Sequence, residues 1–217
     1  YGIVGGSGSG KTVLLTTILN LLPLYRGEIK IFGHDHREVS KRADLQKGWG
    51  VLFQHGALFS SLSVLENVCV PIIEQGHLDK ITAQRIARYK LEMVGLPSNA
   101  FDKMPKELSG GMIKRTALAR ALALDARLVF LDEPTSGLDP ISADAFDQML
   151  KELQTNLGLC VVMITHDLGS LAMCDRIGVI IDKKMREGTV AEIRQDPHPW
   201  IQEYFHGKRA QALFKDV

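Results

Sequence analysis

The sequence has few cysteines and no long hydrophobic run, and both deficits exclude classes of protein. Its 217 residues include three cysteines, Cys69, Cys160 and Cys174, and none of them belongs to a CxxC pair. This usage favours buried, reduced thiols in a cytosolic protein over a disulfide framework. No apolar stretch approaches the ~18 residues of a membrane-spanning helix, and no signal peptide is predicted. We therefore expect any membrane role to depend on a partner.

The chain also lacks an excess of charge of either sign. It carries 26 Lys and Arg residues against 25 Asp and Glu residues, a formal net charge of +1. A protein dedicated to nucleic acid shows a basic excess, so the composition gives no support for that ligand. Hydrophobic residues make up 45% of the chain. This proportion is typical of a globular protein with a sizeable core.

The apolar residues are arranged in short, β-branched runs without alternation. Such runs are typical of strands buried on both faces, as in a parallel sheet covered by helices. The predicted strands are Gly2 to Val4, Gly50 to Phe53, Leu128 to Leu131, Cys160 to Ile164 and Ile177 to Ile181, with an accessory strand at Glu28 to Phe32. The predicted helices between them are Thr12 to Leu21, Ile113 to Leu124 and Ala143 to Asn156. This order predicts an α/β fold.

Residues 54–106 interrupt the alternation of strands and helices. Five apolar residues lie there on one face at helical spacing: Ala83, Ile86, Ala87, Leu91 and Val94. Gly95 then supplies a C-terminal cap, and Pro97 prevents the helix from resuming. We predict a helical subdomain over residues 54–106, inserted into a core made of residues 1–53 and 107–217. The tail from Pro197 onward, with three aromatic residues, predicts a terminal helix.

The glycine-rich stretch of residues 5–12, GGSGSGKT, fits the pattern G-x-x-x-x-G-K-[ST]. A predicted strand precedes it and a predicted helix follows, which is the context that makes this motif credible. Backbone N–H groups of such a loop surround phosphates, the lysine adds charge, and the threonine hydroxyl can bind Mg²⁺. The predicted nucleotide ligands are Gly5, Gly6, Ser7, Gly8, Ser9, Gly10, Lys11 and Thr12. A merely flexible Gly/Ser loop is the alternative.

Two carboxylates follow the strongly apolar run from Leu128 to Leu131. Ligands of open α/β sheets bind at the carboxyl ends of strands, where Asp132 and Glu133 are expected to lie. Asp132 is predicted to hold Mg²⁺ through water, and Glu133 to polarise an attacking water. Two acidic residues after a strand can also be a helix cap, but the nearby phosphate loop favours catalysis.

A second stretch with the composition of an anion-binding helix start lies at Ser109, Gly110 and Gly111, before a helix rich in Ala, Leu, Lys and Arg. Further motifs are Gln54 and His166, each after a predicted strand, and the loop 136–139, SGLD. Along the chain the motifs come in the order phosphate loop, Gln54, residues 109–111, the two carboxylates, residues 136–139 and His166. The order resembles that of the ATP-binding subunit of an ABC transporter. The resemblance covers essentially the whole chain.

The resemblance implies a P-loop NTPase core with a mostly parallel sheet flanked by helices, plus the inserted helical subdomain. The N-terminal strands of that fold are expected upstream, because residues 1–4 read as the end of a strand. It implies ATP and Mg²⁺ as ligands and a homodimer in which Ser109, Gly110 and Gly111 close on the partner's nucleotide. Gln54 would sense Mg²⁺ and the water, His166 would orient the water with Glu133, and Asp139 would reach across the interface.

One residue departs from the family pattern, in which glutamine usually follows the second glycine. Here that residue is Met112, whose side chain cannot replace the hydrogen bonds of an amide. Met112, with the segments 54–59 and 63–68, resembles the ATPase subunit of Mla-type phospholipid transport systems. That resemblance implies integral-membrane permease subunits, a small accessory subunit and a lipid-carrier protein as partners. It implies a peripheral location on the cytoplasmic face of the inner membrane.

Other functions stay open at this point. An ABC importer of another small substrate would share every motif described so far. A soluble ABC-type ATPase acting on nucleic acid or ribosomes tends to carry coiled-coil insertions or two fused cassettes, and neither is predicted here. A non-catalytic regulator would tolerate loss of Glu133 and His166, which are present. Residues 57–72 are predicted to be mostly subdomain core, with part of them forming a groove for a helix of the membrane subunit.

Three smaller features are interpreted as structural. His34, Asp35 and His36 have the spacing of metal ligands, but no further histidine or cysteine cluster completes a site, so a solvated turn is favoured. The pairs at residues 41–42 and 183–184, both basic, are interpreted as solvated loop charge.

Overall fold

A mostly parallel sheet forms the centre of the computed structural model, which describes residues 1–39, 45 and 47–214. The sheet has six strands in the order β4-β5-β6-β1-β7-β8, and all neighbours are parallel except β7 and β8. The strands are β1 (Gly2–Gly5), β4 (Trp49–Leu52), β5 (Leu128–Asp132), β6 (Cys160–Ile164), β7 (Ile177–Ile181) and β8 (Lys184–Gly188). The predicted parallel α/β sheet is confirmed.

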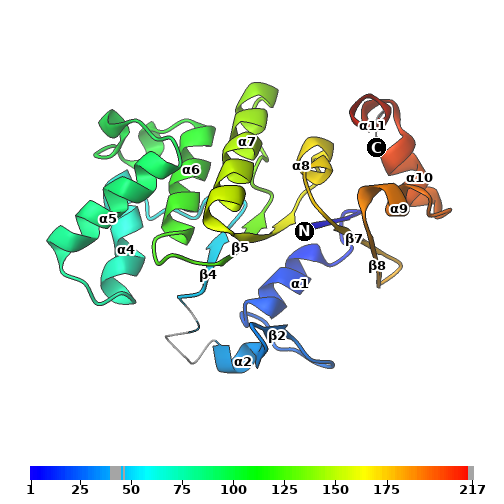
Figure 1. The fold of residues 1–217 in the computed structure, drawn as a ribbon, viewed down its shortest axis with the longest axis horizontal. Coiled ribbons are helices and arrows are strands. Elements are labelled where there is room, and N and C mark those ends of the chain that lie inside the picture. Colours follow the sequence, from blue (N-terminus) through cyan, green and yellow to red (C-terminus); the bar gives the residue numbers. More distant parts are fainter. Residues whose placement is uncertain (40–44, 46, 215–217) are drawn as a thin grey trace.

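Helices cover both faces of this sheet (Figure 1). Helix α1 (Lys11–Ile18) lies on one face, and α6 (Gly110–Ala121), α7 (Pro140–Leu157) and α8 (Leu168–Ala172) lie on the other. Strand β5 shows why its sequence is apolar throughout. Leu128 and Phe130 belong to the cluster beneath α1, whereas Val129 and Leu131 belong to the cluster beneath α6 and α7. A strand covered on both faces buries every residue, so alternation disappears.

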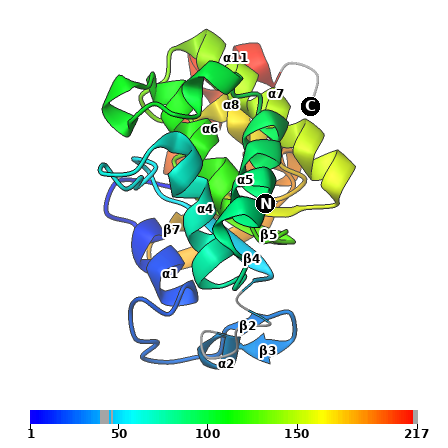
Figure 2. The same ribbon diagram turned by 90° about the vertical axis from the view of Figure 1, so that its left-hand side faces the viewer.

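The smaller elements lie around this centre. A two-stranded antiparallel sheet, β2 (Lys30–Ile31) with β3 (His34–Asp35), is followed by α2 (His36–Val39). Figure 2 shows this unit at one end of the molecule, below α1 in that view. The chain ends in α9 (Val190–Arg194), α10 (Pro199–His206) and α11 (Lys208–Leu213), so the predicted terminal helix is present. The predicted accessory strand at residues 28–32 corresponds to β2.

Residues 54–106 contain α4 (Val64–Glu74), α5 (Lys80–Met93) and the short 3-10 helices η1 (Ser98–Ala100) and η2 (Pro105–Glu107). Their boundaries follow from local capping. The Ser63 side chain and Glu66 form a reciprocal capping box at the start of α4, and Asp79 caps α5. Helix α5 ends where Gly95 adopts a φ of 71°, the left-handed conformation that glycine adopts without strain.

Helix α6 joins these helices to the sheet, because it packs against α4, α5 and β4. Its approach to β4 requires a residue without a side chain. A Cβ atom at Gly50 would lie 2.0 Å from the Ala121 carbonyl oxygen, so only glycine permits this separation of helix and strand. One apolar cluster therefore runs without interruption from α4 and α5 through α6 to the sheet.

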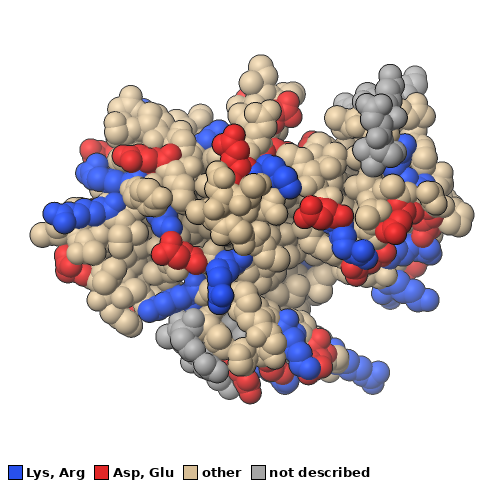
Figure 3. Space-filling view, in the orientation of Figure 1, with Lys and Arg blue, Asp and Glu red and all other residues tan. Residues whose placement is uncertain are grey.

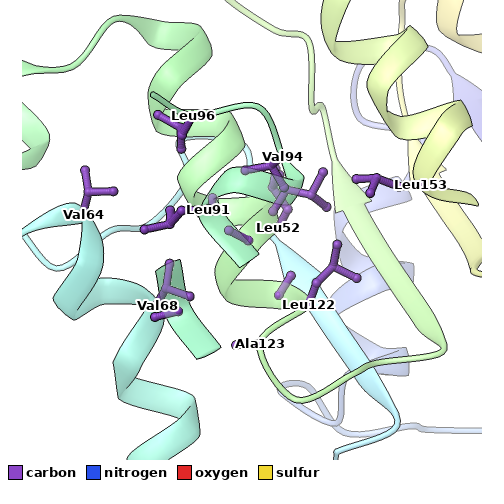
Figure 4. Packing of buried hydrophobic residues seen from close by; sticks show 14 of the residues in the cluster. Leu52, Val64, Val68, Leu91, Val94, Leu96, Leu122, Ala123 and Leu153 are labelled. Carbon is purple, nitrogen blue, oxygen red and sulfur yellow. The ribbon is translucent and has the colours of Figure 1, made fainter. Parts of the chain in front are cut away.

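Figure 4 shows the buried residues of this cluster converging from several elements. Leu52 comes from β4, Val68 from α4, Leu91 from α5, Leu122 from the end of α6 and Leu153 from α7. Of the five apolar residues predicted to share one face of α5, four are fully buried and Ile86 packs partly buried against the cluster. The helical periodicity of this segment therefore predicted its packing correctly.

Two structural expectations were wrong in part. Cys69 is buried, but Cys160, the first residue of β6, is exposed, and Cys174 is only partly buried. His36 is not in a solvated turn: its side chain is buried, with Nδ1 3.4 Å from Asp35 Oδ1. Lys183 and Lys184 are exposed as expected, whereas residues 41–42 lie outside the described residues.

The described part of the chain contains no helix that is long and apolar enough to cross a membrane. On the face drawn in Figure 3, acidic and basic side chains are interspersed, and neither sign dominates a large area. This surface agrees with the balanced composition of the sequence.

The packing of α5 leads to a prediction for stability. Leu91 is 0% exposed, whereas Ile81 on the same helix is 66% exposed. Leu91→Ala should lower the free energy of unfolding by about 2–5 kcal/mol, because it leaves a cavity where α5 packs against α4 and α6. Ile81→Ala should change it by less than about 0.5 kcal/mol. Urea denaturation of both variants is the measurement, and equal losses would contradict this assignment of the core.

Candidate active site

The loop between β1 and α1 is built for close approach of a ligand to the main chain. Its backbone takes positive φ values at Gly8 (75°) and Gly10 (99°), which glycine adopts without strain. Gly5 packs so tightly at the end of β1 that a Cβ atom there would lie 2.5 Å from the Ile180 carbonyl oxygen. The local sequence thus produces a loop with few side chains at the start of a helix, where main-chain N–H groups and the helix dipole attract anions.

Lys11 begins α1, and its ammonium group lies inside the loop. It donates hydrogen bonds to the carbonyl oxygens of Gly5 at 2.7 Å and Gly6 at 3.0 Å, and the residue is 8% exposed. Burial lowers the pKa of Lys11, while the negative charges of Glu133 and Asp132 act to raise it. The lysine is thus electrostatically linked to the two carboxylates at the end of β5. Thr12, next to it, is exposed.

Asp132 and Glu133 stand at the carboxyl end of β5. Asp132 is 8% exposed, and burial raises the pKa of its carboxyl group against the opposing effect of two lysines. Burial also raises the pKa of Glu133. Glu133 has a positive φ of 47°, an uncommon conformation for a residue with a side chain. Its N–H group donates to the Ile164 carbonyl oxygen at 2.8 Å, which ties it to the end of β6.

His166 lies beside Glu133, with Nε2 3.3 Å from Oε1 of the glutamate. The His166 side chain is half-exposed and that of Glu133 is mostly buried. Burial and the charge of Lys11 both lower the pKa of His166, which favours the neutral imidazole. The two side chains come from β5 and from the loop after β6. The structure therefore brings together Lys11, Asp132, Glu133 and His166 at one edge of the sheet.

Gln54 follows β4, the strand next to β5, and its side chain is exposed. Its carbonyl oxygen accepts a hydrogen bond from the Lys114 ammonium group, which attaches this segment to α6. This contact involves the main chain of Gln54 and leaves its side-chain amide free of Lys114.

The glycine-rich segment at the start of α6, residues 109–111, lies apart from the phosphate loop before α1. Ser109 caps α6, with its Oγ accepting from the Met112 N–H group at 3.3 Å, and Ser109 and Gly110 are exposed. Figure 1 shows α6 and α1 in different parts of the molecule, with β5 between them. The segment 109–111 therefore does not line the phosphate loop of its own chain.

Asp139 caps α7 from the loop near this segment. Its carboxylate accepts from the Ser142 N–H group at 3.0 Å and from the Ser142 hydroxyl at 2.6 Å. These hydrogen bonds lower the pKa of Asp139, which is exposed. The loop touches the start of α6, since a Cβ atom at Gly110 would be 3.3 Å from Leu138 Cδ2. Asp139 thus has a structural role as a cap, and its carboxylate faces solvent.

Two groups of residues near the site were not predicted from the sequence. The first is Lys114, whose buried ammonium group contacts the main chain at Gln54 and Glu133. A signal was available, because Lys114 stands at helical spacing with Ala117, Leu118 and Ala121, all of which are buried. A lysine within an apolar stripe requires polar partners in the interior.

The second group is the aromatic pair of α10. Tyr204 donates its hydroxyl hydrogen to the His166 carbonyl oxygen at 2.9 Å, and its ring stacks on Trp200 with 4.8 Å between ring centroids. Trp200 reaches the phosphate loop, since a Cβ atom at Gly6 would lie 3.6 Å from its Nε1 atom. An open pocket of about 520 Å³ lies between His166 and this helix. The tail thus packs against two loops of the site.

Comparison with known proteins agrees with this geometry. The family model described as ABC transporter matches residues 1–136. The chain is 40% identical over 210 residues to the intermembrane phospholipid transport system ATP-binding protein MlaF of Haemophilus influenzae, covering 95% of this chain and 79% of the relative. It is 36% identical to the Escherichia coli protein of that name (94% and 77%). It is 35% identical to the methionine import ATP-binding protein MetN 1 of Staphylococcus aureus (94% and 61%).

Solved structures are also similar. The ATP-binding cassette MJ0796, in a dimeric post-hydrolysis state bound to ADP and Pi, superposes with a TM-score of 0.77 at 32% identity, covering 87% of this chain and 84% of that one. The cbiO1 protein of Clostridium perfringens, part of the ABC transporter complex cbiONQ, superposes with a TM-score of 0.78 at 26% identity, covering 99% and 86%.

A phosphate loop, two carboxylates at a strand end and a neighbouring histidine on a parallel sheet define a P-loop ATPase. The chain belongs to the ABC transporter family and is one of its ATP-binding, ATP-hydrolysing subunits.

A buried carboxyl group behind the His166 loop leads to a pH prediction. Asp147 on α7 accepts a hydrogen bond from the Ser170 hydroxyl of α8 at 2.7 Å. Burial raises the pKa of Asp147 from 3.8 to about 6, although this hydrogen bond opposes the shift. The folded protein thus binds this proton more tightly than the unfolded chain does. The contribution of the Asp147 carboxyl group to the free energy of unfolding is therefore largest below about pH 4 and falls as the pH rises to about 6.

The measurement is urea denaturation of the wild type and of Asp147→Asn between pH 4 and pH 7. The neutral amide cannot titrate, so the stability of the wild type relative to the variant should fall from pH 4 to pH 6 and then stay level. A difference that is independent of pH would contradict the raised pKa.

Proposed function

We propose that this chain powers phospholipid transport between bacterial membranes through separate membrane subunits. The observation that carries the catalytic part is the 3.3 Å approach of Glu133 and His166 beside the phosphate loop. The lipid part is supported by identities of 40% and 36% to two MlaF proteins over nearly the whole chain.

In the proposed reaction the backbone N–H groups of residues 5–10 and the Lys11 ammonium group bind the β- and γ-phosphates of ATP. Glu133 accepts a proton from the attacking water. Its pKa is raised by burial, which makes the carboxylate a stronger base than an exposed one. The lowered pKa of His166 favours the neutral ring, in which one nitrogen can accept a hydrogen bond while the other donates. It would orient the water and contact the γ-phosphate.

The residues proposed to hold Mg²⁺ are Thr12, Gln54 and Asp132. A hydroxyl, an amide oxygen and a carboxylate are the hard oxygen donors that this ion prefers. The raised pKa of Asp132 fits such a role, because the buried carboxylate is not fully compensated by the two lysines near it. When bound, the ion neutralises charge on the phosphate oxygens.

We further propose that two copies of the chain share each ATP molecule. Ser109, Gly110 and Gly111 form an anion-binding helix start that is turned away from their own phosphate loop, and Asp139 stands exposed beside them. The dimeric state of the related cassette with ADP and Pi supports this arrangement. ATP would then join two surfaces, each carrying half of each site, and hydrolysis would release them.

The proposed contact with the membrane subunit is a surface groove of about 340 Å³ between β4 and α4. Phe59 lines it half-exposed, beneath the Arg120 guanidinium group, whose carbon lies 5.8 Å from the ring centroid. This groove would accept a short helix of the permease. We propose that the chain divides into a core of residues 1–53 and 107–217 and a helical subdomain of residues 54–106. The groove would then lie at their junction.

Further partners in this proposal are a small accessory subunit and a lipid-carrier protein, with the ATPase peripheral on the cytoplasmic face of the inner membrane. Import of a small solute is the second candidate. Its support is the 35% identity to MetN 1, a methionine import ATP-binding protein.

Glu133→Gln tests the catalytic proposal. It should reduce kcat for ATP hydrolysis by at least about 100-fold, because an amide cannot take up the proton of the water. MgATP should still bind and should trap a dimer, visible by size-exclusion chromatography with light scattering. Glu152→Gln, an exposed substitution on α7, is the matched control and should retain wild-type activity. A Glu133→Gln protein that stays monomeric with MgATP would contradict the shared sites.

The lipid proposal requires the full-length protein together with the membrane subunits that co-purify with it. In liposomes, transfer of labelled phospholipid to an acceptor should depend on MgATP and should be lost in Glu133→Gln. Phospholipid should raise ATP hydrolysis only when the membrane subunits are bound, because the lipid can act on this chain only through them. Stimulation by methionine or another small solute, without lipid transfer, would support the import candidate instead.

A further inference from the structure

Lys114 is a buried cation whose three hydrogen bonds all go to loops of the active site. It is 4% exposed and lies near the start of α6. The ammonium group donates to the Gln54 carbonyl oxygen, to the Glu133 carbonyl oxygen at 2.9 Å and to the Ser136 hydroxyl at 3.3 Å. An ammonium group has three donors, so every one of them has a protein acceptor. The contacts span 60 residues to Gln54, 19 to Glu133 and 22 to Ser136.

Glu133 depends on this contact for its main-chain conformation. Its φ of 47° is unfavourable for a residue with a Cβ atom and persists only where neighbours fix it. The N–H group of Glu133 is held by the Ile164 carbonyl oxygen. Its carbonyl oxygen accepts from Lys114 and, at 2.9 Å, from the Ser136 hydroxyl. The peptide groups on both sides of the carboxylate side chain are thus fixed, and one of these anchors lies on α6.

The Gln54 segment is attached to the same helix. Besides the bond from Lys114, the Arg120 guanidinium group donates to the carbonyl oxygens of Gly56 and Ala57, each at 2.8 Å. The contact is tight, since a Cβ atom at Gly56 would lie 2.7 Å from Ile113 Cγ2. Two cations of α6 therefore hold the loop after β4 by its main chain. Lys114 is the one that also reaches the end of β5.

We infer that Lys114 is a positioning residue for ATP hydrolysis, which fixes the main chains of Gln54 and Glu133 relative to each other. The inference rests on the catalytic roles proposed above for these two residues. Lys114 would not contact ATP in this scheme: it holds the main chains of the two residues whose side chains are proposed to act on the attacking water and on Mg²⁺. A displacement of about 1 Å between reacting groups is enough to lower the rate of a reaction by about 100-fold. Binding of the phosphates depends on the loop 5–12 and should be affected much less.

The test compares Lys114→Met and Lys114→Arg in the full-length protein with its membrane subunits. Methionine replaces the apolar stem of the lysine but has no donors, so kcat should fall at least tenfold while the KM for ATP stays within threefold. Arginine can donate to several acceptors, and kcat should return to within about threefold of the wild type. Lys151→Met, at an exposed lysine of α7, is the matched control and should leave both constants unchanged.

A Lys114→Met protein with the melting temperature and the kcat of the wild type would overturn the inference. So would equal losses with methionine and arginine in proteins that remain folded, because they would show that volume rather than donors matters. If Lys114→Met does not fold, Lys114→Gln decides by the same criterion, since a shorter amide can reach only one of the acceptors.

A parallel measurement of Glu133→Gln distinguishes failure of the proposed catalytic role of Glu133 from failure of the inference for Lys114. Hydrolysis by that variant would overturn the proposed role of Glu133, and the inference for Lys114 with it. An inactive Glu133→Gln protein beside fully active Lys114 variants would overturn the Lys114 inference alone.

Discussion

Parallel pairing of β5 with β6 is the constraint on which the rest of the site depends. Asp132 is in register with Ile164, and the next residue, Glu133, donates its N–H group to the carbonyl oxygen of Ile164. This pairing places Glu133 3.3 Å from His166, which lies two residues beyond the end of β6. Strand β1 pairs on the other side of β6 and ends at the phosphate loop. A shift of one residue in either register would reverse the side chains and separate the groups.

Helix α6 connects this edge of the sheet to the rest of the molecule. Its first residues form the exposed glycine-rich start, its middle carries Lys114, and Arg120 near its end holds the loop after β4. The groove beside Phe59 is lined by the same Arg120. In the proposed assembly, one helix would therefore contact the partner's nucleotide, the main chain of Glu133 and the membrane subunit. Such a helix can transmit a displacement because its packed core resists deformation.

The site formed by the described residues serves ATP hydrolysis rather than the choice of a transported substrate. The motifs described here would serve a lipid transporter and an importer of small solutes equally well, and relatives of both kinds are 35–40% identical to it. The chemistry of the site concerns phosphates and water alone. In the proposed assembly, differential contacts in other subunits would decide which substrate biases the ATPase.

Most of the secondary structure around the phosphate loop could be predicted from the sequence. Local periodicity predicted five strands of the main sheet, three of the helices between them and the apolar face of α5, because burial on one or both faces dictates which neighbours along the chain are apolar. Strand β8 and the short helix α8 were not predicted. The roles of Lys11, Asp132 and Glu133 were proposed from short motifs for a similar reason, and that of His166 from the resemblance to ABC ATPases. A strand end or a loop between strand and helix is a local feature, and its chemistry can be read from a few residues.

How these parts meet depends on packing between elements that are distant in the sequence. Three contacts of the site join residues that lie far apart in the sequence. His166 lies beside Glu133, Lys114 donates to the Gln54 carbonyl oxygen, and Tyr204 donates to the carbonyl oxygen of His166. The burial of His36 and the exposure of Cys160 likewise depend on what covers them. Hydrophobic periodicity tells which face of an element is buried, but the partner on that face is chosen by strand order and helix packing, which no local pattern contains.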